Sequence, residues 1–286
     1  MANSQTNLFN LVIDTMAKGC VASMQENSLI LNVLPFKDNA GSLTHLYNVV
    51  NAGVKASFRE VGENVVGDCI APEQMVETLK ILSSDILIDR LFYNGRIGNL
   101  NDIRVENTTV AMMSLANLFE ATFFYGTGEN AKEFKGLASR IADGIGKEFT
   151  GELNMDNFDL VLDHISYGAG TKVIICNAKT RRAINKMMRN EGHVVQTVEA
   201  YGQSVISYAG AMIYTSEAVK DDELFFCNFE ESIGVSGLTV GGGLTVTDQG
   251  FEGTSHRDAV EMVAGIKTPH PRCFGILKIG AVAKTK

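Results

Sequence analysis

The chain has 286 residues, of which 45% are hydrophobic and 20% charged, a composition that excludes an intrinsically disordered chain and can fill one large domain or two. Its formal net charge is -8 and no run of lysine or arginine occurs, so the sequence does not indicate a dedicated nucleic-acid reader, which needs a basic patch. A mildly acidic protein can still enclose nucleic acid, provided that it does not need to grip it.

The five cysteines are widely scattered, odd in number and never paired as C-x-x-C, which is typical of reduced thiols in a cytosol-like compartment. The N-terminus lacks a basic segment followed by an apolar core, and no stretch approaches the roughly 18 consecutive apolar residues of a membrane span. We therefore expect a protein that is neither secreted nor membrane-spanning.

The first 35 residues carry a weak helical period, in which four apolar side chains recur at helix spacing: Leu8, Leu11, Val12 and Met16. Two interpretations fit this pattern. The segment is either an arm that packs only when a partner is present or a simple first helix.

Two segments alternate apolar and polar side chains and are predicted as the strands of one ribbon: Thr44–Val50 and Met75–Leu82. A two-stranded ribbon buries too little apolar area to be stable alone in water, so it needs a surface to rest on. The glycine-containing span 51–74 between them is longer than most structureless loops, which leaves a functional loop and a plain surface excursion both open.

The clearest predicted helix covers residues 99–126, with Asn101 or Asp102 as its N-cap and Gly126 at its end. At about 1.5 Å per residue it would be roughly 35 Å long. One apolar stripe runs along it: Met112, Leu115, Ala116, Phe119 and Phe123. Because the helix contains residues of low helix propensity, packing along this stripe must hold it.

The remaining chain alternates predicted helices and strands. Helices are predicted over 131–143, 155–166 and 178–189. Strands are predicted over 172–176, 204–208, 211–214, 224–229, 259–267 and 273–282. This alternation indicates a mixed α/β domain.

No motif for a phosphate cradle or a serine nucleophile is present. The glycine-rich stretch 234–243 fits neither G-x-G-x-x-G nor the P-loop pattern and is interpreted as a flexible turn between strands. Around Ser236, Leu238 stands where a nucleophile elbow requires its second glycine. The GIGK sequence at 144–147 lacks the first P-loop glycine and follows a helix rather than a strand.

Metal and cofactor signals are equally weak, because none of the five histidines forms H-x-x-x-H or H-E-x-x-H. The acidic run 221–223 is interpreted as a solvated turn. Four basic residues of the helix at 178–189 are interpreted as its solvent-facing side: Lys179, Arg181, Arg182 and Lys186. We therefore assign no catalytic, cofactor-binding or metal-binding residue, and we expect no enzyme activity and no cofactor.

Several local stretches resemble a known family: FREVGE at 58–63, DILIDRLFYN at 85–94, EFKGL at 133–137, KVIICNAKTRRAINK at 172–186 and HPRCFGILKIGAVA at 270–283. Taken in order, the segments resemble the major capsid proteins of tailed bacteriophages, which have the Hong Kong 97-type fold. The resemblance covers nearly the whole chain, although no single stretch is as specific as a catalytic signature.

The resemblance implies an α+β fold with an N-terminal arm, an extended β-ribbon loop, a peripheral domain with a long spine helix, and an α/β axial domain. Its implied boundaries are 1–40 for the arm, 41–83 for the extended loop, 84–145 and 251–286 for the peripheral domain, and 146–250 for the axial domain.

The implied function is structural: self-assembly into pentamers and hexamers of a phage head shell, icosahedral or prolate, around double-stranded DNA. The implied location is the virion, with assembly in the host cytoplasm and no contact with a membrane. Implied partners are further copies of the chain, a portal protein, DNA bound without sequence specificity, and a separate scaffolding protein, because Met1 lies close to the arm. Two alternatives remain open, an encapsulin-like nanocompartment shell and a soluble α/β enzyme with an unrecognised site.

Three residues of the extended loop are expected to make contacts between subunits: Phe58, Arg59 and Glu63. Some family members crosslink a loop lysine to an asparagine with a glutamate as base. Lys55 and Lys80 are candidate lysines, but the sequence gives no match for the other two partners, so no crosslink is assigned.

Overall fold

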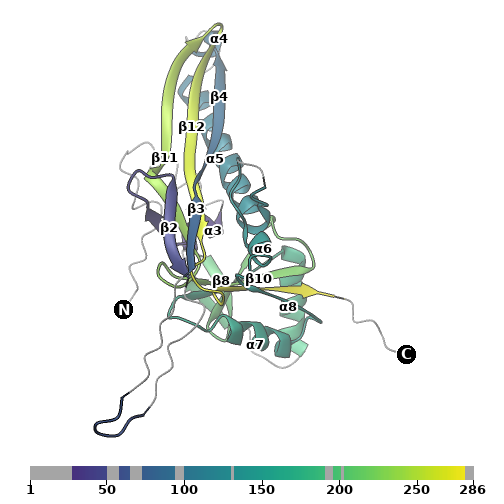
Figure 1. Ribbon diagram of the computed structural model, residues 1–286. Coiled ribbons are helices and arrows are strands. Elements are labelled where there is room, and N and C mark those ends of the chain that lie inside the picture. Colours follow the sequence, from purple (N-terminus) through teal and green to yellow (C-terminus); the bar gives the residue numbers. More distant parts are fainter. Residues whose placement is uncertain are drawn as a thin grey trace.

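A computed structural model describes residues 28–49, 58–64, 73–93, 100–129, 132–190, 196–200 and 203–280. Within these ranges the strands form a two-stranded ribbon, a four-stranded sheet and a seven-stranded sheet, with helices packed on the larger sheets (Figure 1). The chain thus has the α+β architecture that the sequence predicts. The expectations for residues 1–27 lie outside the described residues.

The predicted ribbon exists, but its second strand is shorter than expected. Strand β2 (Thr44–Val49) pairs antiparallel with β3 (Glu73–Thr78). The predicted return strand over 75–82 is wrong beyond Thr78, because β4 (Lys80–Asp89) belongs to the four-stranded sheet. Leu79 separates the two strands: it is buried, and its N–H donates to the carbonyl oxygen of Leu43 over 2.8 Å.

The four-stranded sheet has the order β1-β11-β12-β4, with β1 at Phe36–Asp38, β11 at Ser236–Glu252 and β12 at Ser255–Lys267. Its long β11–β12 hairpin and β4 rise away from the seven-stranded sheet (Figure 1). The turn predicted for the glycine-rich stretch 234–243 is wrong, because this stretch lies largely inside β11. Gly241–Gly243 have positive φ where the register shifts, so these glycines form a bulge within a strand.

Helix α5 (Leu100–Tyr125) lies along β4 and β12, and all five residues of its predicted apolar stripe are buried (Figure 1). It ends before Gly126, as predicted. Asn101 and Asp102 lie within its first turn, so neither is the residue that precedes the helix. The short helix α4 (Arg90–Tyr93) follows β4 at the far end of the four-stranded sheet.

The helix predicted over 131–143 is wrong in extent. Only α6 (Leu137–Arg140) is helical, and residues 130–131 lie outside the described chain. Gly136 explains the difference, because its N–H donates to the carbonyl oxygen of Gly126 over 2.8 Å. The backbone at the end of α5 lies so close to Gly136 that a Cβ atom would not fit there. The chain therefore folds back against the end of α5 before the short helix begins.

The seven-stranded sheet has the order β5-β13-β10-β6-β9-β8-β7. Its strands are β5 (Lys147–Gly151), β6 (Thr171–Cys176), β7 (Gln196–Ala200), β8 (Gln203–Tyr208), β9 (Ala211–Thr215), β10 (Glu223–Phe229) and β13 (Phe274–Ile279). Five of these strands match predicted segments, whereas β5 and β7 were not predicted. The predicted helices α7 (Met155–His164) and α8 (Ala178–Asn190) pack on one face of this sheet.

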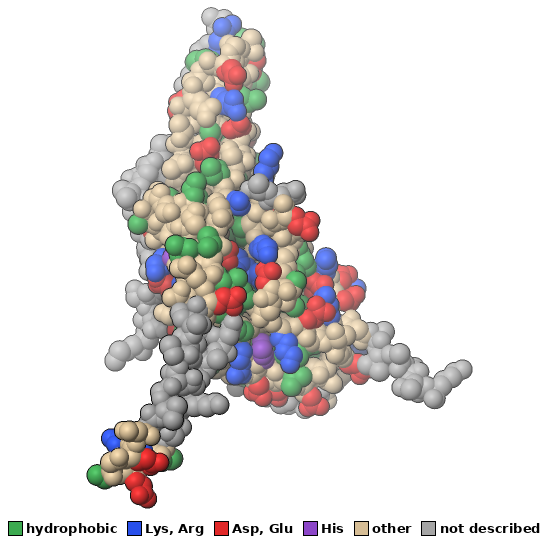
Figure 2. Space-filling view, viewed as in Figure 1, with side chains coloured by type: hydrophobic (Ala, Val, Ile, Leu, Met, Phe, Trp, Pro, Cys, Tyr) green, Lys and Arg blue, Asp and Glu red, His purple; other side chains and the backbone are tan. Residues whose placement is uncertain are grey.

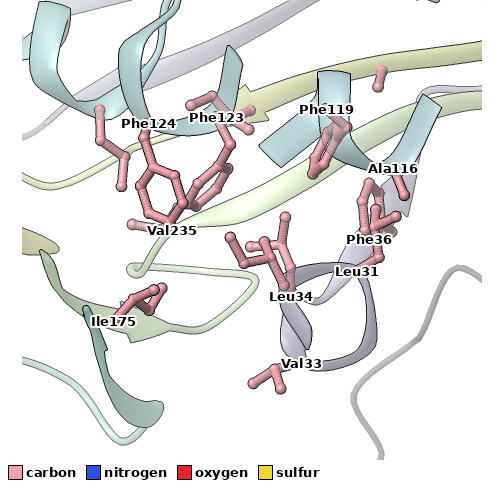
Figure 3. Packing of buried hydrophobic residues seen from close by; sticks show 14 of the residues in the cluster. Leu31, Val33, Leu34, Phe36, Ala116, Phe119, Phe123, Phe124, Ile175 and Val235 are labelled. Carbon is pink, nitrogen blue, oxygen red and sulfur yellow. The ribbon is translucent and has the colours of Figure 1, made fainter. Parts of the chain in front are cut away.

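The opposite face of the seven-stranded sheet meets α5 and the short helix α3 (Leu29–Val33) in the main hydrophobic cluster. Figure 3 shows Leu31 beside Phe36 of β1 and Ala116 of α5, and Leu34 on the side that faces Ile175 of β6. The segment around α3 therefore joins the two larger sheets. Cys176, Cys227 and Cys273 are buried free thiols. Among the residues with described positions, no helix is long and apolar enough to span a membrane.

Candidate assembly interface

The two faces of the β2–β3 ribbon differ in character. Tyr47 and Glu77 lie on the inner, partly buried face, near the buried Leu79. The outer face consists of three exposed cross-strand pairs without a charge: Thr44–Thr78, Leu46–Val76 and Asn48–Gln74. Leu46 and Val76, the central pair, are 56% and 57% exposed. We call these six residues the outer ribbon face. Interfaces between proteins are depleted of charge at their centres, and this face has that character.

One buried arginine fixes the inner face of the ribbon to the body. Arg140 is 1% exposed, and its two terminal nitrogens contact the two carboxylate oxygens of Glu77, with 3.0 Å between Nη2 and Oε2. Its other N–H groups donate to Thr268 Oγ1 over 2.9 Å, to Ile266 O over 3.1 Å and, from Nε, to Lys135 O over 3.1 Å. We call the Arg140–Glu77 ion pair the ribbon clamp.

Electrostatics support a charged clamp. Burial opposes the charged form of Arg140, but Glu77 and Tyr47 together outweigh burial and raise the pKa of the guanidinium above its ordinary value. Tyr47 also donates its hydroxyl to Glu77 Oε1 over 3.1 Å. Burial and the charge of Glu77 raise the pKa of Tyr47 to about 12, so the phenol stays a neutral donor. The clamp therefore ties the ribbon to α6 and to the end of β12.

The predicted contact residues Phe58, Arg59 and Glu63 lie together in one exposed turn, drawn away from the rest of the described chain in Figure 1. Glu60 and Glu63 close this turn, with a backbone N–H···O distance of 3.2 Å and a bond from Glu60 N to Glu63 Oε2 of 3.0 Å. Arg59 donates to the carbonyl oxygen of Glu63 over 3.4 Å. Their contacts with another subunit stay a prediction.

Glu120 joins three parts of the chain. Its carboxylate is buried and accepts hydrogen bonds from Ser28 Oγ over 2.5 Å and from Ser216 Oγ over 2.7 Å. Ser28 precedes α3, Glu120 is in α5, and Ser216 follows β9. The carboxylate therefore connects the N-terminal segment to both larger sheets.

No sequence motif indicates Arg140 or Glu120, and the one available signal for the clamp is Glu77 itself, a carboxylate on the otherwise apolar side of a predicted strand. Lys80 lies in β4, and Lys55 lies outside the described residues. Among the histidines, His256 is buried in β12.

The side chains of Asp248, His256 and Asp258 approach one another closely, with potential ligand atoms within 4.8 Å. A guanidinium already occupies this group, because Arg104 donates to both carboxylate oxygens of Asp258 over 2.6 Å and 2.8 Å. Arg104 also contacts Asp248 at 3.4 Å, and His256 Nε2 lies 3.0 Å from Asp248. The arrangement is an ion-pair network that holds α5 against the β11–β12 hairpin.

Two charged groups that were interpreted from the sequence as solvated lie at the surface, namely the start of the acidic run 221–223 and the basic side chains of α8. Asp221 pairs with Lys179 at 2.9 Å on the surface, and Asp222 is exposed. The basic side chains of α8 are exposed, and Ile184 and Met188 on its other side are buried. Ser236 is fully buried in β11. These groups do not converge on a common cleft in the described part of the chain.

Comparison with protein families gives a direct match. The family model of the SU10 major capsid protein matches residues 100–280, which is more than half of the chain. The matched part contains α5, the seven-stranded sheet and the β11–β12 hairpin. A search of curated protein sequences finds no significant match.

Solved structures share the fold over most of their length. The capsid of an empty GTA particle is 14% identical with a TM-score of 0.66, covering 89% of this chain and 90% of that chain. The capsid of cyanophage A-1(L) is 9% identical with a TM-score of 0.64, covering 87% and 92%. The SrpI encapsulin of Synechococcus elongatus PCC 7942 is 15% identical with a TM-score of 0.66, covering 87% and 86%.

At these identities the solved structures establish the fold, and the family model distinguishes among proteins that share it. Solved structures alone support the encapsulin hypothesis, whereas the family model and solved structures both support the phage hypothesis. The fold and family indicate a structural role in the virion. The chain therefore belongs to the SU10 major capsid protein family, as a shell-forming major capsid protein of a tailed bacteriophage with the Hong Kong 97-type fold.

Proposed function

We propose that this chain assembles as pentamers and hexamers into a phage head that encloses double-stranded DNA, and that the ribbon lies across a neighbouring subunit. The observation that carries the proposal is the outer ribbon face, an exposed surface without charge on a ribbon anchored by the clamp. A ribbon held by one buried ion pair has its direction set before it meets a neighbour. Many small, repeated contacts of this kind can close a shell.

The loop turn supports the same role. Phe58 is fully exposed, at 107% of its reference area, which is costly for a large aromatic side chain in water. Burial of Phe58 against a neighbouring subunit would remove that cost, and Arg59 and Glu63 would then supply polar contacts beside it. These three residues are our proposed inter-subunit contacts from the extended loop.

The division expected from the sequence is 1–40 for the arm, 41–83 for the extended loop, 84–145 with 251–286 for the peripheral domain, and 146–250 for the axial domain. The strand pairing supports a different assignment at two of these boundaries. Strand β11 crosses residue 250, and β13 pairs within the seven-stranded sheet. We therefore propose the four-stranded sheet with α5 as the peripheral domain and the seven-stranded sheet with α7 and α8 as the axial domain.

The proposed partners are a separate scaffolding protein, a portal protein and packaged DNA, with assembly in the host cytoplasm. The net charge of -8 supports a container that does not hold its DNA tightly, because phosphate binding depends on lysine and arginine contacts. Assembly of authentic-size shells by this chain alone would contradict a separate scaffold. Intact monomers on a denaturing gel would support the absence of a covalent crosslink.

Negative-stain electron microscopy of the purified protein, with and without proteins encoded beside it, tests the proposal. We expect closed shells, tubes or hexameric sheets. A compact monomer under every condition would overturn it.

The encapsulin-like alternative is favoured by one observation, the fold shared with the SrpI encapsulin. The contents of particles from the native source separate the two functions. Double-stranded DNA supports a phage head, and a protein cargo supports a nanocompartment.

A further inference from the structure

The exposed side of α7 carries an acidic stripe. Asp156, Asp159 and Asp163 recur at positions i, i+3 and i+7 and are all exposed, whereas Phe158 and Val161 on the other side of the helix are buried. We call these three aspartates the acidic stripe. Acidic side chains gather along the lower edge of the body in Figure 2, where Figure 1 places α7.

The exposed side of α8 carries a basic stripe of the same length. Arg182, Lys186 and Arg189 recur at i, i+4 and i+7 and are exposed, opposite the buried Ile184 and Met188. We call these three residues the basic stripe. Each stripe spans seven residue steps, or about 10 Å along its helix. The two stripes therefore match in length and oppose in charge.

Within the described ranges, neither stripe forms a side-chain ion pair, although Arg272 donates to the backbone carbonyl oxygen of Asp163 over 2.9 Å. Arg182 and Arg189 donate their Nε groups to carbonyl oxygens of their own helix, over 3.3 Å and 3.0 Å. Asp159 accepts from the neutral hydroxyl of Tyr208 over 2.8 Å.

Helix stability does not account for the pattern. Acidic side chains favour the first turn of a helix and basic side chains favour the last turn. Asp156 and Arg189 obey this rule, but Asp163 lies in the last turn of α7. The acidic stripe thus includes one charge that disfavours its own helix.

The positions of the two helices allow a contact between copies. α7 packs against β13 and α8 against β9, which lie on opposite halves of the seven-stranded sheet. Both helices cover the same face of that sheet, so the stripes are two separate patches of one subunit. A contact between two different surfaces of identical subunits is heterologous, and it closes into a ring when the rotation between subunits allows closure.

We propose that the acidic stripe of one copy pairs with the basic stripe of the next copy, head to tail, around each pentamer and hexamer. This inference rests on the proposed shell function and names the contact that forms its rings. Leu160, which is 54% exposed between the acidic residues, supplies an apolar spot beside the ion pairs. The partner is a second copy of this chain, because the complementary charge lies on the chain itself.

Charge reversal and its compensation test the contact. The first variant is Asp156→Lys, Asp159→Lys and Asp163→Lys; the second is Arg182→Glu, Lys186→Glu and Arg189→Glu; the third contains all six changes. We expect each triple variant to lower the yield of shells at least about tenfold, because like charges then face each other at every contact of a ring. The third variant, with all six changes, should form shells with a yield within about twofold of wild type, because opposite charges face each other again.

A control with the same change in net charge as the first variant shows whether position matters. Glu129, Asp222 and Glu261 are exposed acidic residues outside the acidic stripe. Changing these three to lysine should leave the yield within about twofold of wild type. Circular dichroism and thermal melting of unassembled subunits show whether each variant folds. Where a reversed variant fails to fold, Asn and Gln replacements keep the test, and they should weaken the salt dependence of assembly.

The possible failures are distinguishable. Wild-type protein that forms no shell overturns the proposed function. Two outcomes overturn the stripe contact alone, provided that the wild-type protein forms shells. Either a folded triple variant assembles normally, or the variant with all six changes does not regain the wild-type yield. Unchanged salt dependence in the neutral replacements would also overturn it.

Discussion

The seven-stranded body and the β2–β3 ribbon depend on their surroundings in opposite ways. The body buries both faces of its sheet under its own helices, α7 and α8 on one side and α3 and α5 on the other. The ribbon buries one face only, through the clamp, and leaves its outer face exposed and uncharged. The body therefore carries the stability of the subunit, whereas the ribbon leaves one face for the neighbouring subunit that we propose to cover it.

The largest expected effect is the loss of a side chain from the body. Phe226 in β10 is fully buried, and its ring packs edge-on against that of Phe158 in α7, with 5.3 Å between the ring centroids. Phe226→Ala should lower the free energy of unfolding of the unassembled subunit by about 3–5 kcal/mol, through lost burial and the cavity left behind. Urea denaturation measures this effect, with Phe226→Leu as the milder control. A loss below about 1 kcal/mol would contradict a body that is stable by its own packing.

Loss of the ribbon clamp should have the second-largest effect on the stability of the subunit. Glu77→Ala leaves the guanidinium of Arg140 buried without its charge partner and should destabilise the subunit by about 3 kcal/mol. Replacing Glu77 and Arg140 together with methionine should cost less than Glu77→Ala, because no unpaired charge then remains. Urea denaturation of both variants gives the two values. Equal losses would show that the clamp acts through packing and not through charge.

The same comparison explains which parts of the structure were predictable. Helix α5, strand β6 and helix α8 have local periods that any packed environment respects, and all three were predicted. The clamp joins residues 63 positions apart, and no local pattern specifies that pairing. Three successive glycines with positive φ in β11 serve a bulge, although in sequence they resemble a turn. Arg182 and Lys186 of the proposed basic stripe were predicted on the solvent-facing side of α8, but an ordinary solvated helix side has the same sequence pattern, so no contact could be predicted.

A smaller effect is expected where Glu120 of α5 joins the N-terminal segment to the seven-stranded body. Ser216→Ala removes one of the two hydroxyl donors to the buried Glu120 carboxylate and should cost about 1–2 kcal/mol. Ser28→Ala should cost a similar amount, because each hydroxyl also accepts a backbone N–H, that of Leu31 for Ser28 and that of Ala218 for Ser216. Thermal melting of both variants, with Ser139→Ala at a partly buried serine outside this junction as a comparison, ranks the three. A negligible change in both Ser28 and Ser216 variants would show that Glu120 does not link the segments energetically.

The smallest effect on the subunit should accompany a large effect on the shell. Leu46 and Val76 are exposed, so replacing both with serine should change the free energy of unfolding by no more than about 0.5 kcal/mol. If the outer ribbon face lies on a neighbour, the same variant should form fewer shells, because the apolar centre of each contact is lost in every copy. Denaturation of the unassembled subunit and electron microscopy of the assembled sample give the two readings. Shells as abundant and as heat-resistant as wild type would mean that the ribbon faces solvent in the assembly, and would leave its rigid anchoring without a purpose in shell formation.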